Sequence, residues 1–334
     1  MAVAVKTDWI STLFASGTTP KATKKDAASG VALEMLDAGS PGNDGAYDSY
    51  LLLKNGSENH TLTLVLKIYL NKILPEILPK SLRMPMFDAD TPPKMFLIRP
   101  WQLAEWSAFT KNFNRECLKW NDRFWLIPPT SFSALDVKLG GRTVRPNFYC
   151  HLYVALVGSV AGAHRSIDVV NLDLKDAKTR MGLKDSELDS GAFRSDSGKY
   201  DDLDVKTRKQ WSEDYSGTWH QVKNYSTVVH EVGHALGLPH VGVSHNDPLC
   251  QLAIFLDQHV PDRNSLPALY KGGSNSQVCY GNFAAPSRGA NVMGGGSSFD
   301  EANAAPWASR LALHTGTKPE DWSVSQAKVA PRIN

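Results

Sequence analysis

Residues 230–240 read His-Glu-Val-Gly-His-Ala-Leu-Gly-Leu-Pro-His, and this run constrains the fold more than any other feature of the chain. Side chains four positions apart lie on the same face of a helix, so a helix through this run would direct His230 and His234 at one metal ion. Gly237 can take the left-handed backbone conformation that ends helices. The sequence therefore predicts a helix that stops near Gly237, after which the chain turns back and brings His240 to the same ion.

The residue types in this run fit one kind of metal chemistry. Three neutral imidazoles and a water molecule make the open, tetrahedral coordination of a catalytic zinc site. We therefore expect Zn²⁺ as the cofactor, held by His230, His234 and His240. Glu231 lies beside the first ligand and is not needed to hold the metal, so its carboxylate is placed to accept a proton from a water molecule.

The same residues carry a resemblance to a known family. The pattern His-Glu-x-x-His-x-x-Gly-x-x-His is the signature of the metzincin clan of zinc endopeptidases, and residues 230–240 match it. Metzincins also have a Met-turn, a tight turn with a methionine beneath the metal site. Met293 fits this turn, because it lies in the glycine-rich sequence Asn-Val-Met-Gly-Gly-Gly of residues 291–296. The resemblance implies that Met293 forms a hydrophobic floor under the site and is not a ligand.

Several sequence features leave the metzincin subfamily open. In astacins and serralysins a tyrosine two residues after the Met-turn methionine can ligate zinc, whereas this chain has Gly295 at that position. Val241, directly after the third histidine, matches none of the residues that define the usual subfamilies. The chain also lacks a matrixin-type cysteine switch and the cysteine cluster of archaemetzincins. The resemblance is therefore to the clan and not to one subfamily.

Hydrophobic periodicity predicts an α+β fold around the motif. Leucine and isoleucine alternate with other residues from Thr61 to Leu70, which predicts a half-buried strand. The residues that recur at helical spacing over 101–121 are Leu103, Trp106, Thr110, Phe113, Cys117 and Trp120. This spacing predicts an amphipathic helix whose tryptophans pack in the core. Further strands are expected at residues 123–127, 148–157 and 166–172, and long connections at 71–99, 174–221 and 241–292. The zinc-binding helix is expected at Asn224–Leu236. A closing helix is expected at Pro306–Thr315, with Leu311 and Leu313 near the core.

This order of strand, helix, strands and active-site helix resembles that of a metzincin upper subdomain. The resemblance implies a mixed twisted sheet and the active-site helix in an upper subdomain, residues 58–240. A loop-rich lower subdomain, residues 241–334, would carry the Met-turn and be closed by the C-terminal helix. Residues 1–57 contain a turn-rich stretch at 39–45 and are expected to form an N-terminal arm or a pro-segment.

Composition excludes several classes of partner. The net charge of +2 gives no electrostatic reason to expect nucleic acid or an anionic membrane as a partner. The chain has no apolar stretch long enough to predict a membrane span.

The first residues of the chain lack the basic region and apolar core of a secretory signal, so the protein stays in the cytoplasm, is exported by another route, or is a mature form. Localisation and oligomeric state both stay open.

The four cysteines fall into two pairs with different expectations. Cys117 on the expected helix and Cys150 on an expected strand are predicted to be buried free thiols. Cys250 and Cys279 lie in the same loop-rich stretch and are either bridged or two unlinked thiols.

An acidic cluster raises a second metal as an alternative. Asp196, Asp201, Asp202 and Asp204 lie close together in the sequence, and Ca²⁺ prefers such oxygen-rich loops. Their spacing does not fit an EF-hand, so a plain surface loop is the competing interpretation.

The sequence as a whole predicts a zinc-dependent endopeptidase that acts on a protein or peptide substrate in a cleft between two subdomains. Glu231 would be its catalytic general base. The alternative is a zinc-binding structural or cargo component of a larger assembly, with little free protease activity. Glu231 argues against this alternative, because a binding module has no need for that carboxylate.

Overall fold

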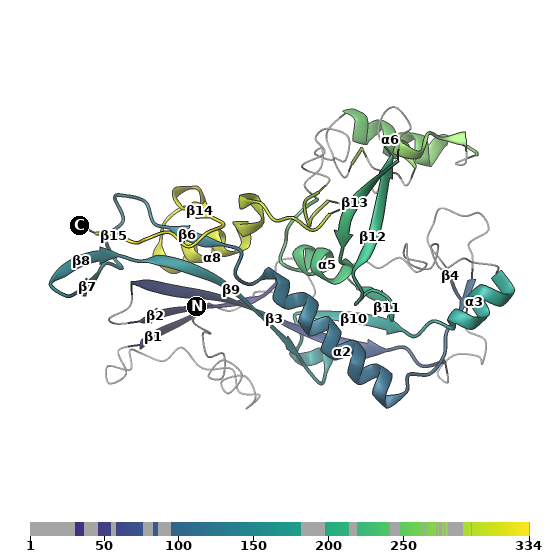
Figure 1. Ribbon diagram of the computed structural model, residues 1–334, viewed down its shortest axis with the longest axis horizontal. Helices are drawn as coiled ribbons and strands as arrows, with labels where there is room; N and C mark the ends of the chain where they lie inside the picture. The colour runs from purple at the N-terminus through teal and green to yellow at the C-terminus, as the bar shows by residue number, and fades with distance from the viewer. Residues whose placement is uncertain are drawn as a thin grey trace.

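The computed structural model arranges the chain around one large sheet, with helices on its faces (Figure 1). It describes residues 31–36, 46–54, 58–75, 83–85, 95–181, 198–213, 219–240, 248–262, 265–271, 273, 276, 278–279, 290–294 and 296–333.

β3 (Asn59–Lys72) is the central strand of an eight-stranded sheet. It runs parallel to β9 (Asn147–Leu156) along one edge. Along its other edge it pairs first with β2 (Asp48–Lys54), antiparallel, and then with β10 (Arg165–Val170), parallel. The remaining strands are β1 (Val31–Leu36), β6 (Trp125–Ile127), β11 (Lys199–Asp201) and β14 (Ser323–Ser325). The sheet is mixed, which confirms the predicted α+β class.

Part of the segment predicted as an N-terminal arm belongs to this sheet. β2 pairs with β3, and β1 pairs with β2 at the outer edge. Tyr47 and Leu51 are buried in the main hydrophobic core. The rest of the predicted arm, residues 1–30, 37–45 and 55–57, lies outside the described residues. The division of the chain into an arm and two subdomains stays a prediction.

The alternating pattern predicted β3 correctly but underestimated its burial. The expected inward residues are all buried, namely Leu62, Leu64, Leu66, Ile68 and Leu70. Thr63 and Val65 on the opposite side are buried as well. Thr63 Oγ1 lies 3.3 Å from Nδ1 of His151 on the neighbouring strand. The middle of β3 is therefore covered on both faces, and the prediction of a half-buried strand is wrong there.

α2 (Leu103–Cys117) and the 3₁₀ turn η2 (Leu118–Trp120) form the amphipathic helix predicted at residues 101–121. A capping box between Gln102 and Glu105 satisfies backbone groups at its start. Phe109, Phe113, Cys117 and Trp120 form its buried stripe, whereas Leu103 is 83% exposed. The buried face is thus shifted from the predicted one, which included Leu103 and omitted Phe109.

All three predicted connections contain regular structure. Residues 71–99 contain the hairpin of β4 (Arg83–Pro85) and β5 (Met95–Leu97). Residues 174–221 contain α3 (Leu174–Met181), β11, β12 (Arg208–Glu213) and the start of β13 (Trp219–Tyr225). Residues 241–292 contain α6 (Pro248–His259) and η5 (Ala268–Tyr270). Other short elements are β7 (Val137–Leu139), β8 (Arg142–Arg145), η3 (Val160–Gly162), η7 (Glu301–Ala304), η8 (Pro319–Asp321) and β15 (Arg332–Ile333).

The predicted C-terminal helix is present as α8 (Ala305–Thr315). Gly316 ends it in the left-handed conformation, with φ of 69°. Trp307 and Leu311 lie fully buried in the core, whereas Leu313 is 65% exposed, so its predicted place near the core is wrong. Leu311 and Leu313 are two positions apart, and residues at that spacing face different sides of a helix.

Cys250 and Cys279 form a disulfide, which decides between the two alternatives left open by the sequence. The bridge lies in a small buried cluster of its own with Ala253 and Val278. Cys117 and Cys150 are buried free thiols, as predicted.

Reducing the disulfide should loosen this small cluster. The disulfide joins two residues that are 29 positions apart, so it removes conformational entropy from the unfolded chain. In the simple loop model this raises the free energy of unfolding by about 3.5 kcal/mol. We expect a reductant to accelerate proteolysis within residues 248–279 of the wild type. The variant that carries both Cys250→Ser and Cys279→Ser should be equally susceptible with and without reductant. Unchanged protection of the reduced wild type would contradict this expectation.

Acid should destabilise the fold through His151. Burial lowers the pKa of His151 to about 4, whereas an unfolded histidine titrates near 6.5. Between these values the unfolded chain binds a proton that the folded chain does not, so stability is full above pH 6.5 and falls as the pH drops toward 4. We expect His151 to contribute about 2 kcal/mol to the loss between pH 7 and pH 5. Urea unfolding of the wild type and of His151→Gln at pH 7 and pH 5 measures this contribution. An equal loss of unfolding free energy in both proteins would contradict the role of His151.

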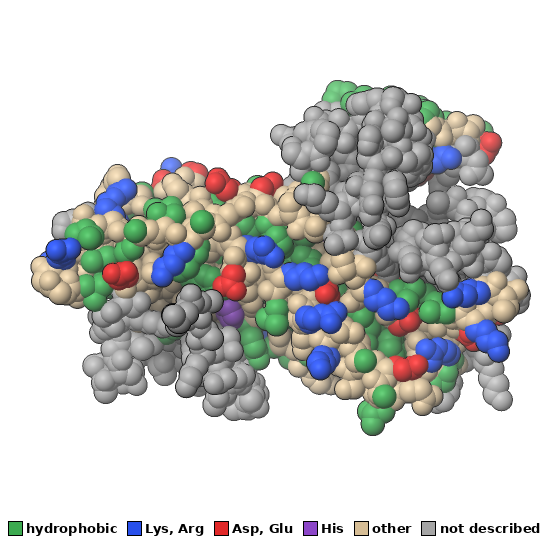
Figure 2. Space-filling view, in the orientation of Figure 1, with side chains coloured by type: hydrophobic (Ala, Val, Ile, Leu, Met, Phe, Trp, Pro, Cys, Tyr) green, Lys and Arg blue, Asp and Glu red, His purple; other side chains and the backbone are tan. Residues whose placement is uncertain are grey.

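The surface shows no segregation of charge on the face seen in Figure 2. Basic and acidic side chains of the described residues are interspersed there, in keeping with the net charge of +2. Within the described part of the chain, no helix is both long enough and apolar enough to span a membrane.

Candidate metal centre

The motif helix, α5 (Thr227–Ala235), starts where a strand ends. β13 continues to Tyr225, so the helix begins three residues later than the predicted Asn224. Ser226 is the N-cap, and its Oγ accepts from the backbone N–H of Val229 at 3.5 Å. The same Oγ donates to a buried carboxylate of α2, Glu116 Oε2, at 2.6 Å. This hydrogen bond ties the start of α5 to α2.

The end of α5 turns the chain back as predicted. Gly237 has φ of 85°, the left-handed conformation. Its N–H donates to the carbonyl of His234 at 2.8 Å, and the N–H of Leu238 donates to the carbonyl of Gly233 at 3.0 Å. These two bonds form a Schellman motif, which satisfies the last helical carbonyls. The reversal brings His240 back beside the helix.

The three histidines converge through their Nε2 atoms. Nε2 of His230 lies 3.1 Å from that of His234 and 3.3 Å from that of His240, and the third distance is 2.9 Å. Nitrogen atoms bound to one tetrahedral zinc ion at about 2.0–2.1 Å would lie about 3.3 Å apart. The three imidazoles therefore fit such an ion. Within the described part of the chain, they are the one group of three or more histidine, cysteine or acidic side chains with metal-site geometry.

Backbone carbonyls orient two of the rings. Nδ1 of His230 lies 2.7 Å from the carbonyl oxygen of Val292, and Nδ1 of His234 lies 2.8 Å from that of Leu238. A carbonyl oxygen can only accept, so each Nδ1 donates and each Nε2 keeps its lone pair. Burial lowers the pKa of His230 to about 3 and also lowers the pKa of His234. Both rings are therefore neutral near pH 7, as metal ligands must be.

Glu231 follows the first histidine in α5 and is almost fully buried. Its charge acts on Tyr200, a fully buried residue of β11. Burial raises the pKa of Tyr200 well above its usual range, and the neighbouring Glu231 adds to the shift. Tyr200 therefore keeps its phenolic proton next to the carboxylate. No sequence signal predicted Tyr200 as a neighbour of the site, because it lies in a stretch expected to be a polar connection.

Met293 lies directly beneath α5. It is fully buried, and Asn291 Oδ1 accepts from its backbone N–H at 2.8 Å. A Cβ built on Gly233 would overlap Sδ of Met293, so the sulfur rests against the helix backbone at that glycine. A Cβ on Gly296 would overlap the backbone of Ala290, which shows why the turn needs a glycine there. The structure thus packs Met293 against α5, and its predicted role as the floor of a metal site stays a prediction.

The described members of the acidic cluster accept hydrogen bonds from backbone N–H groups. Asp201 Oδ1 accepts from the N–H of Leu203, and Asp204 Oδ2 accepts from the N–H of Asp201, both at 2.7 Å. Asp202 Oδ1 accepts from the N–H of Leu172 at 3.0 Å. Asp201 and Asp204 are fully buried, so this part of the loop is no plain solvated surface. Asp196, Gly295 and Val241 lie outside the described residues, and calcium stays a prediction.

Comparison with known proteins finds no relative of this chain. No family model matches the chain. No curated protein and no solved structure gives a significant match either.

Proposed function

We propose that this protein is a zinc-dependent endopeptidase of metzincin type. The observation that carries the proposal is the convergence of three imidazoles, two of them neutral and oriented through Nδ1, with the buried Glu231 directly after the first of them in α5. His230, His234 and His240 would hold the ion. A structural zinc site is usually closed by four protein ligands, whereas three histidines leave one position open for chemistry.

In peptide hydrolysis the residues of the site would have different roles. Zinc held by the three histidines would act as a Lewis acid, which polarises the scissile carbonyl and lowers the pKa of a water molecule to about 7. Glu231 accepts a proton from the attacking water and then passes it to the leaving amine. The carbonyls of Val292 and Leu238 keep His230 and His234 in the tautomer and orientation that ligation needs.

The order of elements supports the metzincin assignment. β3, α2, β9, β10 and α5 follow one another along the chain, which is the order that the resemblance implies for an upper subdomain. Met293 and α8 lie after the motif, as implied for a lower subdomain. A substrate would bind in an extended conformation, adding main-chain hydrogen bonds to an edge strand.

Two measurements on the purified protein test this proposal. Elemental analysis should find one zinc ion per chain, and a broad peptide library should be cleaved within its sequences. A chelator should stop cleavage, and added zinc should restore it. A protein that holds zinc and cleaves no peptide would favour the alternative of a structural or cargo component. A protein that holds no zinc would contradict the site itself.

A further inference from the structure

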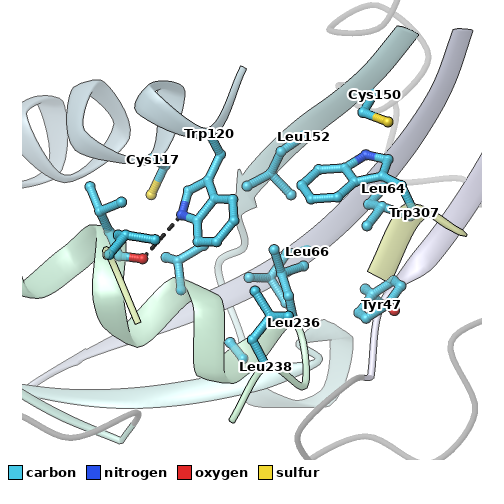
Figure 3. Packing of buried hydrophobic residues seen from close by; sticks show 14 of the residues in the cluster. Tyr47, Leu64, Leu66, Cys117, Trp120, Cys150, Leu152, Leu236, Leu238 and Trp307 are labelled. Carbon is cyan, nitrogen blue, oxygen red and sulfur yellow. Dashed lines mark hydrogen bonds between the residues drawn. The ribbon is translucent and has the colours of Figure 1, made fainter. Parts of the chain in front are cut away.

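Trp120 joins the end of the α2–η2 helix to the metal-binding helix. It is fully buried, and its indole N–H donates to the carbonyl oxygen of Val229 at 3.0 Å. Figure 3 shows this bond as a dashed line from the Trp120 ring to α5. Val229 directly precedes the first ligand, His230. The bond therefore crosses between two helices at the residue next to the metal site.

The ring of Trp120 makes a second contact one helical turn further on. Its Cζ2 atom lies 3.1 Å from the position that a Cβ of Gly233 would take. Sδ of Met293 occupies the same space. Gly233 directly precedes the second ligand, His234. Trp120 therefore touches α5 at residues 229 and 233, which share one face of the helix.

Both contacts would respond to a rotation of α5 about its own axis. Residues 229 and 233 lie on a face next to the one that carries His230 and His234. A rotation of α5 about its axis would move the two Nε2 atoms away from His240, and it would also break both contacts with Trp120. Val229 lies inside α5, where the helix itself offers its carbonyl a donor. The indole bond is thus additional to what the helix backbone needs.

We propose that Trp120 is a positioning residue for the metal centre. Its indole N–H and ring edge fix the rotation of α5 and so the direction of His230 and His234. The inference rests on the proposed metal site, and it assigns Trp120 a role beyond the core packing that the sequence predicted. Trp120 touches neither the ion nor a substrate.

Trp307 provides a matched control for Trp120. It is equally buried in the same core, and its indole N–H also donates to a backbone carbonyl, that of His151, at 3.0 Å. His151 belongs to β9, so this bond does not involve α5. Trp120→Phe and Trp307→Phe each remove one buried indole and one hydrogen bond. They differ in whether the lost bond holds the metal-binding helix.

The experiment compares both variants with wild type by three measurements. We expect zinc affinity to fall at least about tenfold in Trp120→Phe, the scale for losing an outer partner of a metal site, and to stay within about threefold of wild type in Trp307→Phe. The visible spectrum of the cobalt-substituted protein should change only in Trp120→Phe. Amide hydrogen exchange over residues 227–235 of the metal-free protein should accelerate in Trp120→Phe and not in Trp307→Phe.

Each result decides a separate claim. Equal zinc affinity and equal exchange in the two variants would overturn the role of Trp120 and leave the zinc site intact. A wild type that binds no zinc would overturn the metal site, and exchange in the metal-free protein would still show whether Trp120 holds α5. If Trp120→Phe does not fold, 3-benzothienylalanine at position 120 keeps the ring shape and removes only the N–H. Wild-type zinc affinity in that protein would likewise overturn the proposal.

Discussion

Replacing Glu231 by glutamine should leave a folded, zinc-loaded protein that hydrolyses peptides at least about a hundredfold more slowly. Glutamine keeps the shape and the hydrogen-bonding reach of the carboxylate but cannot accept a proton. The carbonyls of Val292 and Leu238 orient two of the imidazoles, those of His230 and His234, so these two rings do not rely on Glu231 for their direction. Zinc content and the rate of peptide cleavage, measured on the same preparation, test the expectation.

His230→Ala is the control that separates chemistry from metal binding. It removes a ligand and should therefore lower zinc occupancy together with activity. Glu231→Gln should lower activity alone. Wild-type cleavage by Glu231→Gln would show that the proposed general base is wrong, and the structural or cargo role would then be favoured.

Gly233→Ala should disrupt the metal centre although alanine is the better helix former. The added methyl group overlaps Sδ of Met293 and lies 3.1 Å from Cζ2 of Trp120, both in fully buried side chains. Overpacking of this kind costs about 1–3 kcal/mol, more than the gain of up to about 1 kcal/mol in helix propensity. Displacing Met293 also shifts its neighbour Val292, whose carbonyl orients His230. We therefore expect zinc affinity to fall about 10- to 100-fold.

Gly162→Ala is the matched control for this change. A Cβ on Gly162 would meet nothing within 4 Å, so the substitution adds the same methyl group in open space. Urea unfolding and zinc titration of both variants should separate them. If Gly233→Ala keeps wild-type stability and zinc affinity, Met293 and Trp120 do not restrain the helix as tightly as described.

The local part of the site could be predicted from the sequence, because its geometry follows from neighbouring residues. Spacing placed His230 and His234 on one helical face, and Gly237 predicted the turn that returns His240. The start of the helix was predicted too early, since β13 extends to Tyr225 and pairing with β12 overrides the local helical pattern. Such pairing partners are not visible in a short window of sequence.

Partners from distant parts of the chain could not be predicted. Tyr200 and Trp120 reach the site through the packing of β11 and η2, and neither has a sequence pattern that points to a metal centre. α6 was missed for a different reason. Apolar residues occur on most sides of Pro248–His259, so the segment lacks the one-sided periodicity by which a helix is recognised.

The two oriented ligands differ in where their partners come from. The partner of His234 is Leu238, four residues away, so this ring is set as soon as the helix and its turn form. The partner of His230 is Val292, 62 residues further along the chain. A nascent chain that ends shortly after His240 would carry all three imidazoles but not the carbonyl that orients the first. If the site binds zinc as proposed, high-affinity binding would therefore come only after the later segment has docked against α5.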